Sequence, residues 1–436
     1  MTVYRERWAE SCKRKDIEMT YIEFYDKTSI VNICSCLTNI PDRVILVGGD
    51  RKPIERRKAD YRRVFSDRGH NIDFDCRTVN KNSMDDIISK LEEIITLDDE
   101  IAVDLTGGDD LMLVAMGIVY ERHRTERNIQ LHRFNIRSNT IYDCDSDGKT
   151  IEKDDLKLSV EENIRIYGGE VVMGAEDGDS GTRPWDITPE FQWELEAMWD
   201  ACRSNICAWN VQVTILAVAE QYRQADNDRL TTRVSLADVR KHFEENGGVF
   251  AMKRSVLNKL QMAGLITFYY DDDTLLVRYK NDQVKRLLSK AGNVLELKVY
   301  TELIALEDDA GNPLYDAMNG VVIDWDGNER DGESRVDTYN EVDIVAMKGA
   351  LPVFISCKNG STVEMEELYK LYSVSERFGG EYTKRILIAT SIDDTKEYFK
   401  HFRQRAKDMG ITIIDDFAVC DDKERERVLR SLWQRK

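Results

Sequence analysis

The sequence predicts an α/β protein that is divided into several domains. A chain of 436 residues is long enough for two to four of them. In the first part of the chain, apolar strands at 43–47 and 101–105 run directly into glycine-containing turns and then helices, as in a parallel sheet covered by helices. Near the end, strands at 340–345 and 352–358 are joined by a short connection and predict a hairpin.

The composition is acidic, with 62 Lys and Arg against 81 Asp and Glu. Such a chain is not a general coat for nucleic acid, so binding nucleic acid would require locally basic surface and a metal ion that offsets its own carboxylates. No apolar run has the length of a membrane span or the position of a signal peptide. Nine scattered cysteines and only five histidines favour free thiols in a reducing cytoplasm and disfavour His-based catalysis.

Residues 1–17 are charged and aperiodic and predict a loose leader. Residues 18–167 predict a Rossmann-like domain, because strands and helices alternate along them. The strand at 43–47 ends in glycines, beyond the edge of the sheet where ligands of such folds bind. The helix that follows is rich in Arg and Lys between 51 and 63, and forms either a solvated face or a rim that attracts anions. The candidate ligand-binding residues at this turn are Gly48, Gly49 and Asp50.

A second glycine turn, at 106–110, follows the strand at 101–105 and opens an apolar helix. Adjacent glycines let backbone N–H groups approach a ligand closely, and a helix N-terminus favours negative charge. The two acids in the turn repel a phosphate-rich ligand, so they either contact ribose hydroxyls or cap the helix. The candidate ligand-binding residues here are Thr106, Gly107, Gly108, Asp109 and Asp110.

Residues 168–187 are rich in glycine and acidic side chains and predict a linker. Residues 188–290 predict several helices followed by two strands, which resembles a winged helix. Lys253, Arg254 and Lys259 on its last long helix are candidates for contact with DNA phosphates. A structural spacer or dimer element is favoured over that interpretation, because the turn between the two strands, at 271–273, is acidic.

Residues 291–436 carry the candidate catalytic residues. The hairpin brings Asp343 and Lys358 near one another, and Glu296 comes from a preceding helix. Carboxylates of this kind hold a hard cation such as Mn²⁺ or Mg²⁺, which polarises a phosphodiester, while the lysine supports the attacking hydroxide or the developing charge. Ser356 stands where a second acid would precede the lysine, and the Cys357 carbonyl is a further candidate metal ligand. Candidate replacement acids follow on the next helix: Glu364, Glu366 and Glu367.

Taken alone, this pattern also fits a hairpin with one salt-bridged Asp and a solvated Lys. However, the site resembles the PD-(D/E)xK core of restriction-endonuclease-like α/β/α nucleases, and the Thr-Gly-Gly turn resembles the ligand loop of CARF domains. The order of the two is similar to that of CRISPR-associated ancillary nucleases. That resemblance implies a homodimer, activated by cyclic tetra-adenylate in type III CRISPR antiviral defence, which cleaves single-stranded or nicked nucleic acid with Mn²⁺ or Mg²⁺.

Two other functions remain open at this point. One is a ligand-responsive DNA-binding regulator in which the middle domain binds DNA and the C-terminal domain is inactive. The other is a ring nuclease whose CARF pocket degrades the cyclic oligoadenylate itself.

Overall fold

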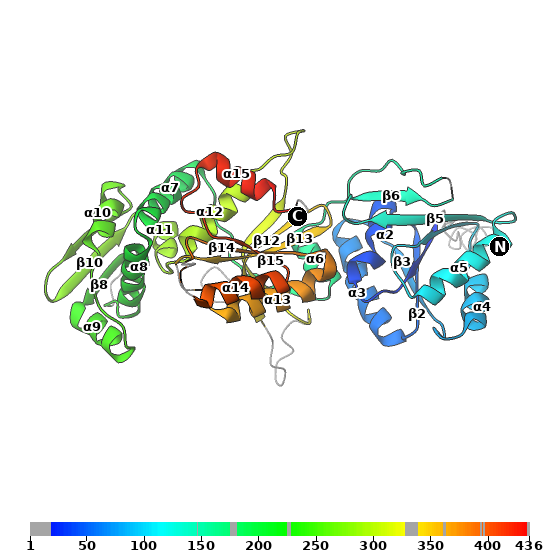
Figure 1. Cartoon of the computed structure of the whole chain (residues 1–436), viewed down its shortest axis with the longest axis horizontal. Helices are drawn as coiled ribbons and strands as arrows, with labels where there is room; N and C mark the ends of the chain where they lie inside the picture. The colour runs from blue at the N-terminus through cyan, green and yellow to red at the C-terminus, as the bar shows by residue number, and fades with distance from the viewer. Residues whose placement is uncertain are drawn as a thin grey trace, which may run out of the picture.

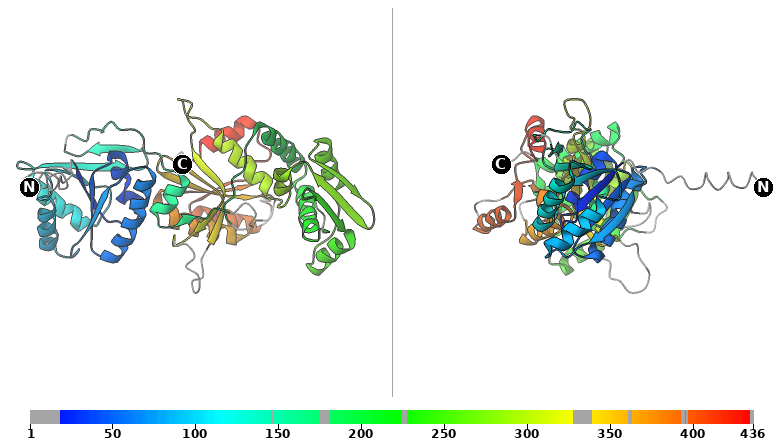
Figure 2. Two further views of the ribbon diagram at one scale, coloured as in Figure 1. Left: turned by 180° about the vertical axis from the view of Figure 1, so that it is seen from behind. Right: turned by 90° about the vertical axis from the view of Figure 1, so that its right-hand side faces the viewer.

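The computed structural model describes residues 19–145, 147–174, 181–224, 228–327, 339–360, 363–392, 395 and 397–433. Three units lie in a row (Figure 1), and the C-terminal unit, coloured yellow to red, lies between the other two. Seen from behind, the C-terminal unit again lies between the other two (Figure 2). The expected leader at 1–17 lies outside the described residues. No helix in the described parts of the chain is long and apolar enough to cross a membrane.

The N-terminal unit is a six-stranded sheet covered by helices. Its elements are β1 (Thr20–Phe24), η1 (Ser29–Asn32), α2 (Cys34–Asn39), β2 (Arg43–Gly48), α3 (Arg51–Asp67), β3 (Asp73–Thr78), α4 (Met84–Ile94), β4 (Glu100–Asp104), α5 (Asp110–His123), β5 (Asn128–Asn135) and β6 (Thr140–Asp143). The strand order β3-β2-β1-β4-β5-β6 is that of a Rossmann fold, with only β6 antiparallel to its neighbour. The central strands are buried because helices cover them, and the predicted Rossmann-like domain is confirmed.

The C-terminal unit is built on a second six-stranded sheet. Its elements are β7 (Glu170–Val171), α12 (Asn293–Ile304), β11 (Asp316–Asp324), β12 (Tyr339–Lys348), β13 (Leu351–Lys358), α13 (Met365–Gly379), η2 (Gly380–Tyr382), β14 (Lys384–Ala389), α14 (Glu397–Asp408), β15 (Ile411–Ile414) and α15 (Asp422–Arg430). The strand order is β15-β14-β13-β12-β11-β7. β12 and β13 form the predicted antiparallel hairpin, whose turn places Gly349 at a φ of 62°.

The segment predicted to be a linker, 168–187, contributes a strand to the C-terminal sheet. Within it, β7 pairs with β11, with Glu170 opposite Asp324. The helix just before it, α6 (Val160–Ile166), begins at a capping box made by Ser159 and Glu162. Glu162 also forms an ion pair with Arg68, the residue after α3, with 2.6 Å between Oε1 and Nε. This part of the chain is therefore an edge of the C-terminal unit and a bridge to the N-terminal one, and not a free connection.

The middle unit has the topology of a winged helix, as predicted. Its elements are α7 (Pro189–Ser204), α8 (Ile206–Gln221), β8 (Thr231–Ser235), α9 (Leu236–Glu245), α10 (Arg254–Met262), β9 (Ile266–Tyr270), β10 (Thr274–Tyr279) and α11 (Asp282–Leu287). The expected hairpin of β9 and β10 is extended by β8, which pairs antiparallel with β10. β8 was not predicted. Its one apolar residue, Val234, is buried in a core that the middle unit shares with α12 and with strands of the C-terminal sheet.

Candidate active site and ligand loops

The hairpin fixes the orientation of Asp343 at its open end. The ladder between β12 and β13 begins with Lys348 opposite Leu351 and ends with Ile344 opposite Ile355. Asp343 is the next residue on β12. Its Oδ2 accepts hydrogen bonds from the Cys357 backbone N–H at 2.7 Å and from the Ser356 hydroxyl at 3.2 Å. Ser356, in the position expected for an acid, therefore orients the aspartate. Neither hydrogen bond involves Oδ1 of Asp343.

Lys358 lies at the same small cavity as Asp343. Its ammonium pairs with Glu367 of α13, with 2.8 Å between Nζ and Oε2. Among the three acids that the sequence offered on this helix, Glu367 is the one that lines the cavity. The hairpin and α13 thus bring together the predicted Asp and Lys with one replacement acid. The polar residues that line this cavity are Glu341, Asp343, Ser356, Lys358, Glu367 and Lys370.

Glu296 reaches the site from the first turn of α12 and is only 6% exposed. Burial and the charge of Asp343 raise its pKa to about 7. Lys290 lies 3.3 Å from it, measured from Nζ to Oε1. Burial disfavours the Lys290 ammonium, but the charges of Glu296, Glu341 and Asp343 outweigh this effect and raise its pKa. Lys290 and Glu341 were not predicted; Glu341, two residues before Asp343 on one strand, lies on the same face as Asp343.

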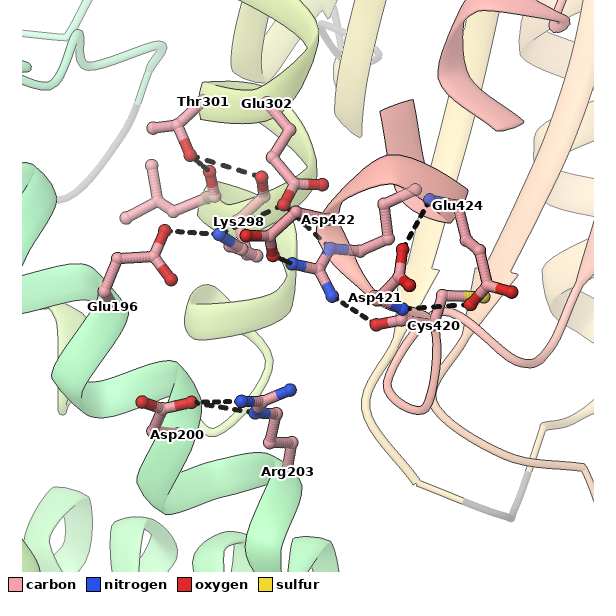
Figure 3. Close-up of polar contacts among 12 residues, drawn as sticks. Glu196, Asp200, Arg203, Lys298, Thr301, Glu302, Cys420, Asp421, Asp422 and Glu424 are labelled. Atoms are coloured by element: carbon pink, nitrogen blue, oxygen red, sulfur yellow. Dashed lines mark hydrogen bonds and ion pairs between the residues drawn. The ribbon is translucent and has the colours of Figure 1, made fainter. Parts of the chain in front are cut away.

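An ion-pair network holds α12, and hence Glu296, in place (Figure 3). The buried ammonium of Lys298 pairs with Glu302 at 3.0 Å and with Glu196 of α7. The buried guanidinium of Arg425 on α15 also pairs with Glu302, at 2.8 Å. The network ties α12 to the middle unit on one side and to the end of the chain on the other.

The donor atoms at this site are those that a hard cation prefers. Asp343 and Glu296 supply carboxylate oxygens. Burial and then the charge of Asp343 raise the pKa of Glu296, and a cation between the two carboxylates would offset both effects. The Cys357 carbonyl points to the same side of its strand as the N–H that contacts Asp343. Among the described residues, no group of three His, Cys, Asp or Glu side chains forms a metal site. Two carboxylates and one backbone carbonyl suit Mg²⁺ or Mn²⁺, because these ions bind through one or two carboxylates together with water and phosphate oxygens.

The Thr-Gly-Gly turn follows β4, next to the end of β1. Gly108 has a φ of 110°, and a Cβ on it would lie 2.4 Å from the Cβ of Phe24. A Cβ on Gly107 would lie 2.7 Å from Val31 Cγ2. The Thr106 backbone N–H donates to the buried carboxylate of Asp104 at 2.8 Å, and the Thr106 hydroxyl accepts from the Phe134 N–H at 2.7 Å. Both glycines are required by close packing, which holds the turn in one conformation.

The acids of the two predicted ligand loops lie at helix N-termini. Asp109 accepts from the Leu111 N–H at 3.2 Å and caps α5, and Asp110 is the first residue of that helix. Asp50 accepts from the Lys52 N–H at 3.3 Å and caps α3. A Cβ on Gly48 would lie 2.8 Å from Ile54 Cδ1, and one on Gly49 would lie 3.2 Å from the Lys81 side chain. For Asp109 the capping alternative is the one observed.

Thr106 also lines a cavity of about 550 Å³ between the N-terminal sheet and η2 of the C-terminal unit. Two cations, Arg133 and Arg137, line the same cavity, as does Tyr382 of η2. Thr106 of the predicted ligand loop therefore faces the C-terminal unit through a space that is lined by two arginines and one acid, Glu381.

Comparison with known proteins gives the fold over nearly the whole chain. No family model and no curated protein matches it. Among solved structures, it is similar to protein VC1899 from Vibrio cholerae, with a TM-score of 0.68 at 16% identity, over 95% of this chain and 97% of that one. It is also similar to Can2 from Sulfobacillus thermosulfidooxidans in complex with cyclic tetra-adenylate, with a TM-score of 0.64 at 17% identity, over 96% of this chain and 100% of that one. The chain thus has the fold of VC1899 and Can2, and the resemblance to a CARF-containing ancillary nuclease is confirmed at the level of the fold.

Proposed function

We propose that this protein is a metal-dependent nuclease of type III CRISPR antiviral defence that cyclic tetra-adenylate activates. The observation that carries the proposal is that Asp343 and Lys358 line one cavity at the open end of the β12–β13 hairpin, with Glu296 close enough to Asp343 for its charge to raise the Glu296 pKa. The fold supports it, since the structure of Can2 that resembles this chain contains cyclic tetra-adenylate.

In this proposal Asp343, Glu296 and the Cys357 carbonyl hold Mn²⁺ or Mg²⁺. The ion supplies polarisation of the phosphoryl group and a lowered pKa of bound water. Lys358 places positive charge where the phosphoryl oxygens become more negative, and Glu367 keeps the ammonium in position at 2.8 Å. Ser356 and the Cys357 N–H hold the Asp343 carboxylate in one orientation. Water adds to phosphorus as the P–O bond to the leaving nucleoside oxygen breaks, and that oxygen takes up a proton.

The activator site in this proposal is formed by the turns after β2 and β4 of two protomers. A symmetric ring is best matched by a two-fold homodimer, which presents the same turn twice. The cavity lined by Thr106, Arg133 and Arg137 adds positive charge that favours a polyphosphate ring. Its position against η2 provides a route by which ligand binding changes the C-terminal unit.

The test is incubation of the full chain with labelled single-stranded DNA, RNA and nicked plasmid, with Mn²⁺, and with or without each cyclic oligoadenylate. We expect cleavage only with both metal and activator. Asp343→Ala should abolish cleavage and leave activator binding, measured by calorimetry, unchanged. The matched control is Glu364→Ala, an exposed acid just before α13. Cleavage by Asp343→Ala would refute the site assignment.

The winged-helix topology of the middle unit favours a second candidate, a ligand-responsive DNA-binding regulator. However, Lys259 donates to Ser204, and Arg254 lies over Tyr270 with 5.9 Å between Cζ and the ring centroid. Specific duplex binding that is lost in Arg254→Gln, without metal-dependent cleavage, would identify this function instead.

A further inference from the structure

A second and larger cavity, of about 560 Å³, adjoins the candidate active site. Glu341 lines both cavities, and Glu296 lines the larger one. Its lining also includes two arginines, Arg183 from the segment before α7 and Arg286 from the C-terminal part of α11. The acids and the arginines thus face one shared space, although the chain as a whole is acidic.

The two arginines have no carboxylate partner among the described residues. The Arg286 guanidinium donates to two neutral backbone carbonyls, those of Pro184 at 3.1 Å and Arg183 at 2.8 Å. Arg183 Nε and Nη2 are shielded from solvent and have no hydrogen-bond acceptor in the parts of the chain that the structure describes. Buried charges are normally paired, so among the described residues this positive charge lacks a compensating anion.

The position of the Arg286 guanidinium is held by packing. The Arg286 guanidinium lies over the Trp185 ring, with 3.8 Å between Cζ and the ring centroid. The other partner of this ring is Phe191, stacked at 5.5 Å with an interplanar angle of 13°. The Trp185 indole N–H donates to Asn319 Oδ1 at 3.2 Å, and Asn319 donates to the Asp343 carbonyl at 3.0 Å. Arg286 is thereby linked through two side chains to the strand that carries the candidate catalytic aspartate.

We propose that Arg183 and Arg286 form a subsite for a backbone phosphate of the nucleic-acid strand that crosses the candidate active site. The inference rests on the proposed nuclease function and names how its substrate is held. Guanidinium groups match a phosphate with two parallel hydrogen bonds, and two such groups side by side bind it more strongly than one. A phosphate at the arginines and the next part of the strand at Glu296 and Asp343 would place one continuous polyanion along both cavities.

The principal test compares wild-type protein with Arg183→Gln, as full chains in EDTA so that no cleavage occurs. Binding of fluorescein-labelled single-stranded oligonucleotides, DNA and RNA, is measured by anisotropy over a range of salt, with and without cyclic tetra-adenylate. Loss of a hydrogen-bonded phosphate contact predicts an affinity roughly 10- to 100-fold weaker. The slope of log K against log salt should fall by about 0.7, the value for one phosphate on a single strand.

Arg254→Gln, on α10, is the comparison that reports binding by the winged helix. The control is Arg427→Gln, an exposed arginine on α15. We expect its binding to equal that of wild type. Wild-type affinity of Arg183→Gln overturns the proposal, as does a loss confined to Arg254→Gln, which assigns the nucleic acid to the winged helix.

The melting temperature separates a subsite from a structural role. Removing an uncompensated buried cation should leave the melting temperature of Arg183→Gln equal to or above that of wild type, whereas a lower value assigns a structural role and overturns the proposal. Should this variant fail to fold, Arg183→Lys replaces it, because lysine keeps the charge but lacks the planar guanidinium. We expect Arg183→Lys to bind the oligonucleotide more weakly than wild type, with an unchanged salt slope. Wild-type affinity of Arg183→Lys overturns the proposal.

Failure of the nuclease function is distinguishable from failure of this subsite. If wild type cleaves nothing with any activator, thermal shift with inorganic phosphate and with hexathymidylate still reports on Arg183. Stabilisation of wild type by the oligonucleotide, reduced in Arg183→Gln, supports the subsite. A shift given equally by phosphate alone indicates a site for free phosphate, and the absence of any shift overturns the proposal.

Discussion

The protonation of Glu296 makes a quantitative prediction about the metal-free protein. Its pKa is raised from 4.5 to about 7 in the folded chain, so the folded state binds this proton more tightly than the unfolded state does. The associated stability is fully present below pH 4.5 and is lost as the pH rises through 7. From these two pKa values, wild type should lose about 2 kcal/mol through this group between pH 5.5 and pH 8.0. Glu296→Gln, which carries no charge, should not show this loss.

The assay is urea unfolding in EDTA, followed by tryptophan fluorescence at both pH values. Hydrogen exchange of peptides from α12 assigns the relevant transition to the C-terminal unit. Other groups titrate in the same range, but they cancel when wild type is compared with the variant. The matched control is Glu364→Gln, an exposed acid just before α13, which should behave as wild type. If Glu296→Gln is no more stable than wild type at pH 8.0, the argument that Glu296 is a destabilised, metal-ready carboxylate is wrong.

Three further predictions concern the Thr-Gly-Gly turn, the ion-pair network around α12 and metal binding. Gly108→Ala should cost more than about 1 kcal/mol and weaken activator binding, because of its φ of 110° and the contact with Phe24. Gly117→Ala, in α5 with open space around it, should instead stabilise by about 0.5–1 kcal/mol; thermal melting compares the two. Lys298→Met should cost about 3 kcal/mol by leaving Glu302 and Glu196 with one cation fewer, and the double variant with Glu302→Gln should recover part of this loss. Equal melting temperatures of the single and double variants would contradict that account. Excess Mn²⁺ should raise the melting temperature of wild type at pH 8.0 but not that of Asp343→Ala.

Much of the fold follows from local sequence patterns. The strands before the Thr-Gly-Gly turn and in the β12–β13 hairpin are apolar runs with turn residues at their ends, and these are local signals. Ser159 and Glu162 have the spacing of a capping box, which is a local signal for the start of α6, a helix that was not predicted. Residues 170 and 171 gave no such signal, because a two-residue strand exists only through pairing with β11, far along the chain.

The candidate site could be predicted only in part, for the same reason. Asp343, Ser356 and Lys358 lie on one hairpin, so their proximity is a matter of register. The contact of Lys358 with Glu367 depends on how α13 packs on the sheet, and the sequence left three acids open. Arg183 and Arg286 are 103 residues apart and meet only through the packing of the middle unit on the C-terminal one.

The pairing of β7 with β11 makes the C-terminal unit discontinuous in sequence. A truncated protein that began near residue 291 would lack β7 and α6, and the long outer strand β11 would present free N–H and C=O groups to solvent. Bare strand edges of this kind promote aggregation. It would also lack Arg183. A soluble fragment should therefore begin before Val160. The part of the protein with the candidate active site is better isolated by removing what precedes α6 than by cutting after the winged helix.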